Sequence, residues 1–195
     1  MTDTGAELSP SWDFAYLIGV IAGDGCITRA GHVYKLEISC DAAYPEISTY
    51  HDLIAMVTGL RVNVYKAKGR QCFRVVANSA ELPTLLGLPP GAKSRSGFTI
   101  PEWIFEDLEY VKAFVKGLIE TDGTVARVHR HAGWYSHVHF SAANPVIMAA
   151  FLRAMSILGL SFRVNGPKAY LSNTAQSEQL VADLGITKRK VYYYP

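Results

Sequence analysis

Apolar residues along this chain occur in two kinds of pattern. Two long and almost uninterrupted apolar runs, residues 14–21 and 110–119, predict helices that are surrounded by other parts of the protein. Residues 34–40 instead alternate between apolar and polar side chains, which is the period of a strand that lies on a core with one face. The predicted apolar face carries Tyr34, Leu36, Ile38 and Cys40, and the polar face carries Lys35, Glu37 and Ser39. The polar face of this strand is therefore available to a binding partner.

Turn and capping residues divide the chain into two halves with the same order of elements. Each half is predicted to contain a helix, two strands, a helix, two strands and a helix, an αββαββα unit. The elements are residues 11–24, 26–29, 32–40, 44–59, 61–66, 71–77 and 78–86, and then residues 103–122, 124–130, 135–141, 144–159, 161–164, 168–172 and 173–185. Ser11 or Ser9 is the predicted cap of the first helix, and Glu81 follows Asn78 in capping-box spacing. Residues 87–101, rich in proline and glycine, are predicted to link an N-terminal half, residues 1–86, to a C-terminal half, residues 102–195.

The first helix of each half ends in a related sequence of nine residues. Residues 17–25 read LIGVIAGDG and residues 115–123 read VKGLIETDG, so that Asp24 matches Asp122 at a separation of 98 residues. An acid in the last turn is unfavourable for an isolated helix, because the C-terminal end of a helix carries partial negative charge. The pair therefore suggests that a cation lies between the two acids. Gly25 and Gly123 are predicted to end their helices in the left-handed conformation.

Small residues within the two motifs are placed to let the two helices touch. They are Gly19 and Gly23 in the first helix and Gly117 and Thr121 in the second. A motif that occurs twice in matching context is far more specific than a single match. On these residues the chain resembles the LAGLIDADG homing endonucleases, and the repeated order of elements extends the resemblance over nearly its whole length.

This resemblance implies an α+β fold of two αββαββα halves related by a pseudo-twofold axis. The motif helices would form the interface, and eight strands would form two saddle-shaped antiparallel sheets that lie along double-stranded DNA. It also implies a monomeric, intron-encoded enzyme that cuts both strands of a long asymmetric target and leaves short 3′ overhangs. Asp24 and Asp122 match the catalytic, metal-binding acids of the family. The implied cofactor is Mg²⁺, with Ca²⁺ or Mn²⁺ able to take its place in binding.

Other positions depart from the family pattern. A second acidic position of the motif is occupied by Ala22, which cannot bind metal, and by Glu120, to which we assign a structural role. The glutamine that often ends the second strand is absent, and Asp41 is a candidate to contribute in its place. The family also has a lysine near the metals. Lys66, Lys68 and Lys168 are open candidates for it, and each is as readily explained as a phosphate contact.

The net charge of +2 is weak evidence for a nucleic-acid partner, so the placement of the charges carries that argument. Basic residues cluster at residues 66–74, 127–130 and 188–190, although any one cluster alone is more simply a solvated surface. His137 and His139 alternate with apolar residues and are predicted to contact DNA or water rather than zinc. The complete set of predicted DNA contacts is Lys35, Glu37, Ser39, Lys66, Lys68, Arg70, Arg74, Arg127, Arg130, His137, His139, Arg163 and Lys168.

The remaining composition excludes several classes of protein. No apolar run approaches the roughly 18 residues of a membrane span, so we expect no membrane partner. The first twelve residues have neither the basic nor the apolar region of a secretory signal, and three cysteines suit a reducing compartment. We therefore expect an intracellular protein, cytoplasmic or organellar. The alternative function is a binding protein of the same fold, either an RNA maturase that contacts intron RNA or a transcription regulator. The presence of both aspartates favours the enzyme.

Overall fold

The computed structural model describes residues 8–41, 46–68, 71–130, 133–187 and 189–193. Its first half begins with a helix whose N-terminus is capped by the Ser11 hydroxyl, which accepts a hydrogen bond from the backbone N–H of Phe14. The elements of this half are α1 (Trp12–Gly23), β1 (Gly25–Ala30), β2 (Val33–Asp41), α2 (Glu46–Thr58), β3 (Val62–Lys66), β4 (Cys72–Ser79) and α3 (Leu82–Leu86). The predicted αββαββα order is therefore present in the first half.

The second half repeats this order and adds one element at each end. It consists of the 3-10 helix η1 (Glu102–Phe105), α4 (Leu108–Asp122), β5 (Gly123–Arg130), β6 (Gly133–Ser141), α5 (Pro145–Ile157), β7 (Arg163–Asn165), β8 (Lys168–Leu171), α6 (Thr174–Asp183) and β9 (Lys190–Tyr193). The single helix predicted near residues 103–122 is divided, because the Asp107 carboxylate caps a new helix by accepting from the N–H of Glu109. The cap of α6 is Asn173, which accepts from the N–H of Gln176.

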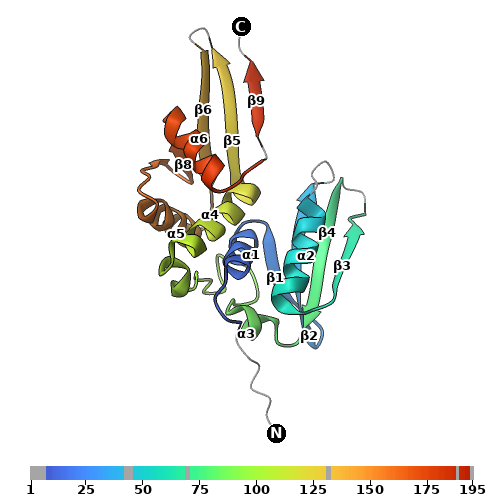
Figure 1. Ribbon diagram of the computed structural model, residues 1–195. Coiled ribbons are helices and arrows are strands. Elements are labelled where there is room, and N and C mark those ends of the chain that lie inside the picture. The colour runs from blue at the N-terminus through green and yellow to red at the C-terminus, as the bar shows by residue number, and fades with distance from the viewer. Residues whose placement is uncertain (1–7, 42–45, 69–70, 131–132, 188, 194–195) are drawn as a thin grey trace.

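The strands form two sheets with equivalent strand orders, β1-β2-β4-β3 and β7-β8-β6-β5-β9 (Figure 1). All pairs are antiparallel except β5 with β9, which are parallel. The described residues form nine strands rather than the expected eight, and β9 is the additional strand. The four residues of β9 follow a short loop and have no alternating pattern to mark them. Only their pairing with β5 makes them a strand.

The two motif helices, α1 and α4, lie together between the two sheets (Figure 1). Their side chains form one continuous core with the inner faces of both sheets, and Leu17, Ile18 and Phe114 are fully buried in it. Helix α2 packs on β3 and β4, α5 packs on α4, and α6 packs on β6. No helix in the described part of the chain has the length and apolar character needed to cross a membrane.

Three local predictions were wrong. Gly123 is extended, with φ −93°, and neither Gly25 nor Gly123 is among the glycines with positive φ. Glycine is needed at both positions for space instead, because a Cβ at Gly25 would lie 2.6 Å from the Cα of Ile21. The strand β4 continues to Ser79, and Ser79 rather than Asn78 accepts from the N–H of Glu81, so the predicted capping box does not form.

Candidate functional site

The site is built where α1 and α4 approach each other closely enough for their backbones to touch. A Cβ at Gly117 would lie 2.6 Å from the carbonyl oxygen of Tyr16 and 2.7 Å from the backbone nitrogen of Val20. A Cβ at Gly19 would overlap the carbonyl oxygen of Phe114, and one at Gly23 would overlap the side chain of Thr121. These contacts hold the C-terminal ends of the two helices next to each other.

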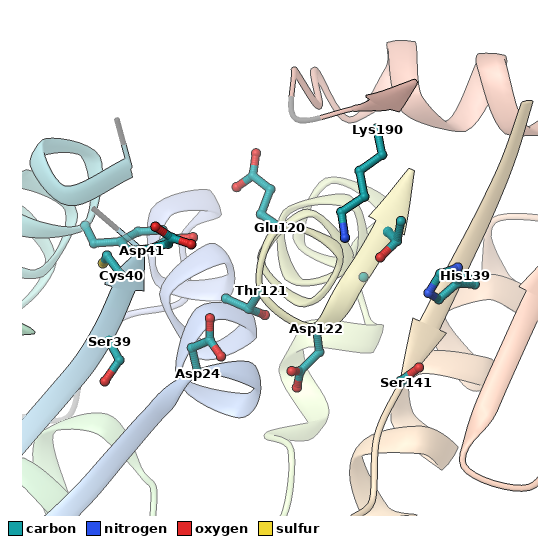
Figure 2. Close-up of a pocket in the computed structure, with 13 residues that line it drawn as sticks. Asp24, Ser39, Cys40, Asp41, Glu120, Thr121, Asp122, His139, Ser141 and Lys190 are labelled. Atoms are coloured by element: carbon teal, nitrogen blue, oxygen red, sulfur yellow. The ribbon is translucent and has the colours of Figure 1, made fainter. Parts of the chain in front are cut away.

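Asp24 and Asp122 stand at those two helix ends. Asp24 is the C-cap of α1, and its backbone N–H donates to the carbonyl oxygen of Val20. Asp122 is the last residue of α4. Both side chains line one pocket of about 470 Å³, and Figure 2 shows them at the ends of neighbouring helices. The other lining residues are Ser39, Cys40, Asp41, Tyr50, Glu120, Thr121, Gly123, Thr124, His139, Ser141 and Lys190.

The two carboxylates influence each other electrostatically. Burial and the nearby negative charge of Asp24 together raise the pKa of Asp122 above its ordinary value, and the charge of Lys93 partly opposes this rise. Bringing two like charges into a partly desolvated pocket is unfavourable unless a cation compensates them. The pocket therefore favours a positive charge between the ends of α1 and α4.

Lys93, a residue of the linker between the halves, supplies part of that charge. Its Nζ donates hydrogen bonds to the carbonyl oxygens of Ala22, at 2.7 Å, and Gly23, at 2.5 Å, in the last turn of α1. Burial lowers the pKa of the Lys93 ammonium, and the charges of Asp122 and Asp24 oppose that shift. The Asn144 side chain donates to the carbonyl oxygen of Lys93, which ties this part of the linker to the second half.

Another lysine, from the unpredicted strand, lines the pocket itself. Lys190 is the first residue of β9, and Figure 2 shows its side chain extending into the pocket toward the end of α4. Lys93 follows Asp24 by 69 residues and Lys190 follows Asp122 by 68. This near-equal spacing could have identified the two lysines from the sequence. The sequence prediction instead considered Lys66, Lys68 and Lys168, and so it missed both Lys93 and Lys190.

Glu120 also borders the pocket but is engaged within the protein. Its carboxylate accepts from the hydroxyl of Tyr16, at 2.5 Å, and from the Nζ of Lys116, at 2.7 Å. Because Tyr16 is on α1 and Lys116 is on α4, the carboxylate links the two motif helices. The matching position in α1 is Ala22, which is buried.

The predicted contacts of the first half gather on the polar face of its sheet. Residues paired across neighbouring strands share a face, and Ser39 pairs with Arg74 in β4. On this face the Glu37 carboxylate forms ion pairs with Lys35 and Arg74, and the nitrogen-to-oxygen distance is 2.8 Å in each pair. Burial raises the pKa of Glu37, but the hydrogen bond and charge of Lys35, with the charge of Arg74, lower it overall. Glu37 is only 8% exposed, so it orients the two cations rather than standing free in solvent.

The polar face of the second sheet is richer in histidine. His139 pairs with Thr124 and Tyr170, His137 pairs with Ala126, and Ala126 pairs with Lys190. Lys168 pairs with Ser141 and Arg163 pairs with Tyr170, so both predicted contacts share this face. The two polar faces meet the pocket from opposite sides, because Ser39 and Asp41 line it from β2 and His139 and Ser141 line it from β6.

Three of the predicted contacts, Arg127, Lys66 and Lys68, are not brought onto these faces. Arg127 pairs with Ser136 on the other side of its sheet and lies 4.8 Å from the ring of Trp134, toward α6. Lys66 pairs with Phe73 on the side of Val75, which packs into the core, and Lys68 follows the end of β3. The alternation of side chains along β5 and β3 decides the faces on which Arg127 and Lys66 lie. Arg70 lies outside the described residues, as does the side chain of Arg130.

The residues in the pocket fit a hard divalent cation. Among the described residues there is no cluster of three or more histidine, cysteine, aspartate or glutamate side chains suited to holding a metal ion. Mg²⁺ does not require one, because it is commonly bound by one or two carboxylates, with water and substrate phosphates completing its coordination. The carboxylates of Asp24 and Asp122, which line one pocket at the two helix ends, provide such a partial ligand set.

No protein-family model and no curated protein matches this sequence. The fold is nevertheless similar to solved structures. I-DmoI in complex with DNA and Mn matches with a TM-score of 0.60 and 16% identity, over 91% of this chain and 98% of that one. The N-terminal LAGLIDADG domain of DUF199/WhiA matches with a TM-score of 0.59 and 12% identity, over 94% and 88%. Full-length DUF199/WhiA from Thermatoga maritima matches with a TM-score of 0.59 and 11% identity, over 93% and 58%. The chain therefore has the LAGLIDADG fold.

Proposed function

We propose that this protein is a monomeric, Mg²⁺-dependent, site-specific endonuclease that cuts both strands of double-stranded DNA. The observation that carries the proposal is the pair of carboxylates, Asp24 and Asp122, at the touching ends of α1 and α4 in one pocket. The target is a long asymmetric sequence and the products have short 3′ overhangs. The likeness to I-DmoI in complex with DNA and Mn supports the substrate and the need for a divalent metal.

The carboxylates of Asp24 and Asp122 would hold the divalent cation. When bound, Mg²⁺ supplies an activated water and stabilises the charge that develops on the scissile phosphate. Each aspartate serves one of the two strands, because the two halves present equivalent helix ends to the duplex. The negative charge of Asp24 raises the pKa of Asp122 because the two carboxylates repel each other. A bound cation would relieve this repulsion.

Two lysines would complete the site. Lys93 already donates to the end of α1 and lies within the electrostatic influence of both aspartates. Lys190 enters the pocket from the second sheet. An ammonium group beside the scissile phosphate stabilises negative charge on the phosphate and on the leaving oxygen. We assign Lys93 to the half-site of Asp24 and Lys190 to that of Asp122.

The polar faces of the two sheets would hold the duplex on either side of the pocket. In the first sheet the proposed contacts are Lys35, Ser39 and Arg74, with Glu37 orienting the cations. In the second they are His137, His139, Arg163 and Lys168. Side chains of β-strands can reach base edges in the major groove, where each base pair presents a distinct set of donors and acceptors. This arrangement accounts for site-specific binding by a chain with little net charge.

The second candidate function is DNA binding without cleavage. The likeness to the LAGLIDADG domain of DUF199/WhiA favours keeping it, because that comparison is nearly as close as the one with I-DmoI. The two functions differ in what they require of the pocket. A binding protein needs the polar sheet faces but has no need for two aspartates and two lysines at the helix ends.

The deciding experiment first finds the target and then tests cleavage. Duplexes retained by the protein from a randomised library in Ca²⁺ are sequenced, and the enriched duplex is incubated with Mg²⁺ after labelling each strand separately. We expect cleavage of both strands with Mg²⁺ and binding without cleavage in Ca²⁺. Asp24→Asn and Asp122→Asn should each bind the duplex and fail to make the double-strand cut. Specific binding with no cleavage by the unaltered protein would favour the regulator, and unchanged cutting by both variants would refute the assigned roles.

A further inference from the structure

The two halves carry different residues at equivalent strand positions near the pocket. In the first half Gly25 pairs with Ile38, and in the second half Gly123 pairs with Phe140. The residue before Ile38 is Glu37, and the residue before Phe140 is His139. The Glu37 carboxylate is held by Lys35 and Arg74, and Glu37 is not one of the residues that line the pocket, whereas His139 is. The chemistry available to the two half-sites is therefore unequal.

The surroundings of His139 favour a neutral imidazole. Its ring centroid lies 6.4 Å from that of His137 in the same strand and 5.9 Å from that of Tyr170 in β8. Lys168 of β8 and Lys190 of β9 are the cations that act on it. Burial first, and then the positive charges of His137, Lys168 and Lys190, lower the pKa of His139 below its ordinary value. Near neutral pH its unprotonated nitrogen is able to accept a proton.

Figure 2 shows His139 and Lys190 on the side of the pocket that carries Asp122, while Asp41 and Ser39 are on the side of Asp24. The histidine thus accompanies one aspartate only. In the first half the described pocket-lining residues include no histidine.

We propose that His139 is the proton acceptor for hydrolysis of the strand bound beside Asp122, and that the strand beside Asp24 is cut without a histidine. The assignment rests on the proposed nuclease function. In the step, the oxygen of a water molecule forms a bond to phosphorus as the bond from phosphorus to the 3′ oxygen breaks. A proton of that water passes to the imidazole of His139, and the departing 3′ oxygen takes a proton from solvent. The imidazolium then returns its proton to solvent.

This assignment makes the two strands respond differently to pH. Protonated His139 cannot accept a proton, so cutting of the Asp122-side strand rises with pH through the histidine pKa and then levels off. The other strand has no such step. Any titration of metal-bound water affects both half-sites, so the second strand is an internal control within the same protein and the same reaction.

The experiment measures single-turnover cleavage of each labelled strand between about pH 5 and pH 8, with the unaltered protein and with His139→Gln. We expect the unaltered protein to show different pH profiles for its two strands. His139→Gln should slow one strand by about 100-fold or more and remove its pH-dependent step, while the other strand keeps its rate. Affinity for the duplex in Ca²⁺ should change far less, which separates a role in the reaction from a role in binding.

His137→Gln is the matched control, because it removes a histidine two positions away on the same face. It should leave the pH-dependent step in place, and any loss of affinity should affect both strands together. Identical pH profiles for the two strands of the unaltered protein would overturn the assignment. So would a difference between the strands that persists in His139→Gln. If the unaltered protein cut neither strand, the proposed function and this assignment would both be overturned. If His139→Gln cut both strands at the rates of the unaltered protein, only the assignment would be overturned.

Discussion

The Nζ atom of Lys93 donates a hydrogen bond to the backbone carbonyl oxygen of Ala22 at 2.7 Å, and so joins the linker between the halves to the last turn of α1. The last carbonyl groups of a helix have no partner within the helix, and a cation is the preferred group at this end. The same ammonium group offsets the charges of Asp24 and Asp122. One side chain thus serves both the stability of the motif helix and the charge balance of the pocket.

We expect Lys93→Met to reduce both stability and cleavage. Loss of charge-assisted hydrogen bonds should lower the free energy of unfolding by about 1–3 kcal/mol. Cleavage of the selected duplex should fall by at least about tenfold, because the charge is lost beside the scissile phosphate. Denaturant unfolding and strand-cleavage rates measure the two effects. Lys112→Met is the control, since Lys112 forms a surface ion pair with Glu109, and such pairs contribute little to stability. Equal stability of the two variants would contradict the structural role of Lys93.

The touching backbones of α1 and α4 predict a severe effect of a single methyl group. Gly19→Ala should destabilise the protein by several kcal/mol, because the added Cβ would overlap the carbonyl oxygen of Phe114 and force the helices apart. Thermal unfolding measures the change. At Gly23 the added carbon meets a side chain, Thr121, rather than backbone. The cost of Gly23→Ala should therefore be partly recovered by adding Thr121→Gly, whereas no recovery would show that the helices are not in contact there.

Asp122→Asn should raise stability at neutral pH. Burial and the charge of Asp24 raise the pKa of the Asp122 carboxyl in the folded protein above the ordinary value that it has in the unfolded chain. Between these two pKa values the folded state binds more protons than the unfolded state, so the stability of the unaltered protein falls as pH rises through this range. The variant avoids that loss.

The gain from Asp122→Asn should appear as a higher Tm at pH 7 and disappear as pH falls below about 4. A gain of roughly 1 kcal/mol would correspond to about 2–4 °C for a protein of this size. Glu106→Gln, at an exposed acid outside the pocket, should leave Tm almost unchanged. A lower Tm for Asp122→Asn at pH 7 would mean that the carboxylate is stabilised in the folded protein rather than strained.

Arg74 and Arg127 should differ in their effect on DNA binding, because they lie on opposite faces of their sheets. Arg74→Ala removes a cation that Glu37 orients on the polar face, and we expect affinity for the selected duplex to fall by about tenfold or more. Arg127→Ala removes a cation that lies over Trp134 on the side of α6, and affinity should change little. Titration of the labelled duplex in Ca²⁺ measures both. An equal loss of affinity in the two variants would mean that DNA does not lie along the polar faces.

The order of elements was decided by the sequence to a large extent. The apolar runs predicted α1 and α4, the alternation of residues 34–40 predicted the two faces of β2, and the repeated order of elements predicted two equivalent sheets. These features are local, because they depend on the periods of the helix and the strand and on turn chemistry. The motif also placed Asp24 and Asp122 at matching helix ends.

The residues that surround the two aspartates were decided by the tertiary structure. Lys93 belongs to a linker without a regular pattern, and Lys190 begins a strand that exists only by pairing with β5. Neither Gly25 nor Gly123 adopts the left-handed conformation. Glycine is required at these positions because the preceding turn of the helix approaches closely. Which face Arg127 occupies depends on the register of its strand with β6. Sequence by itself determined which residues could form elements, and long-range packing determined which side chains share a site, because contacts between distant segments leave no period in the chain.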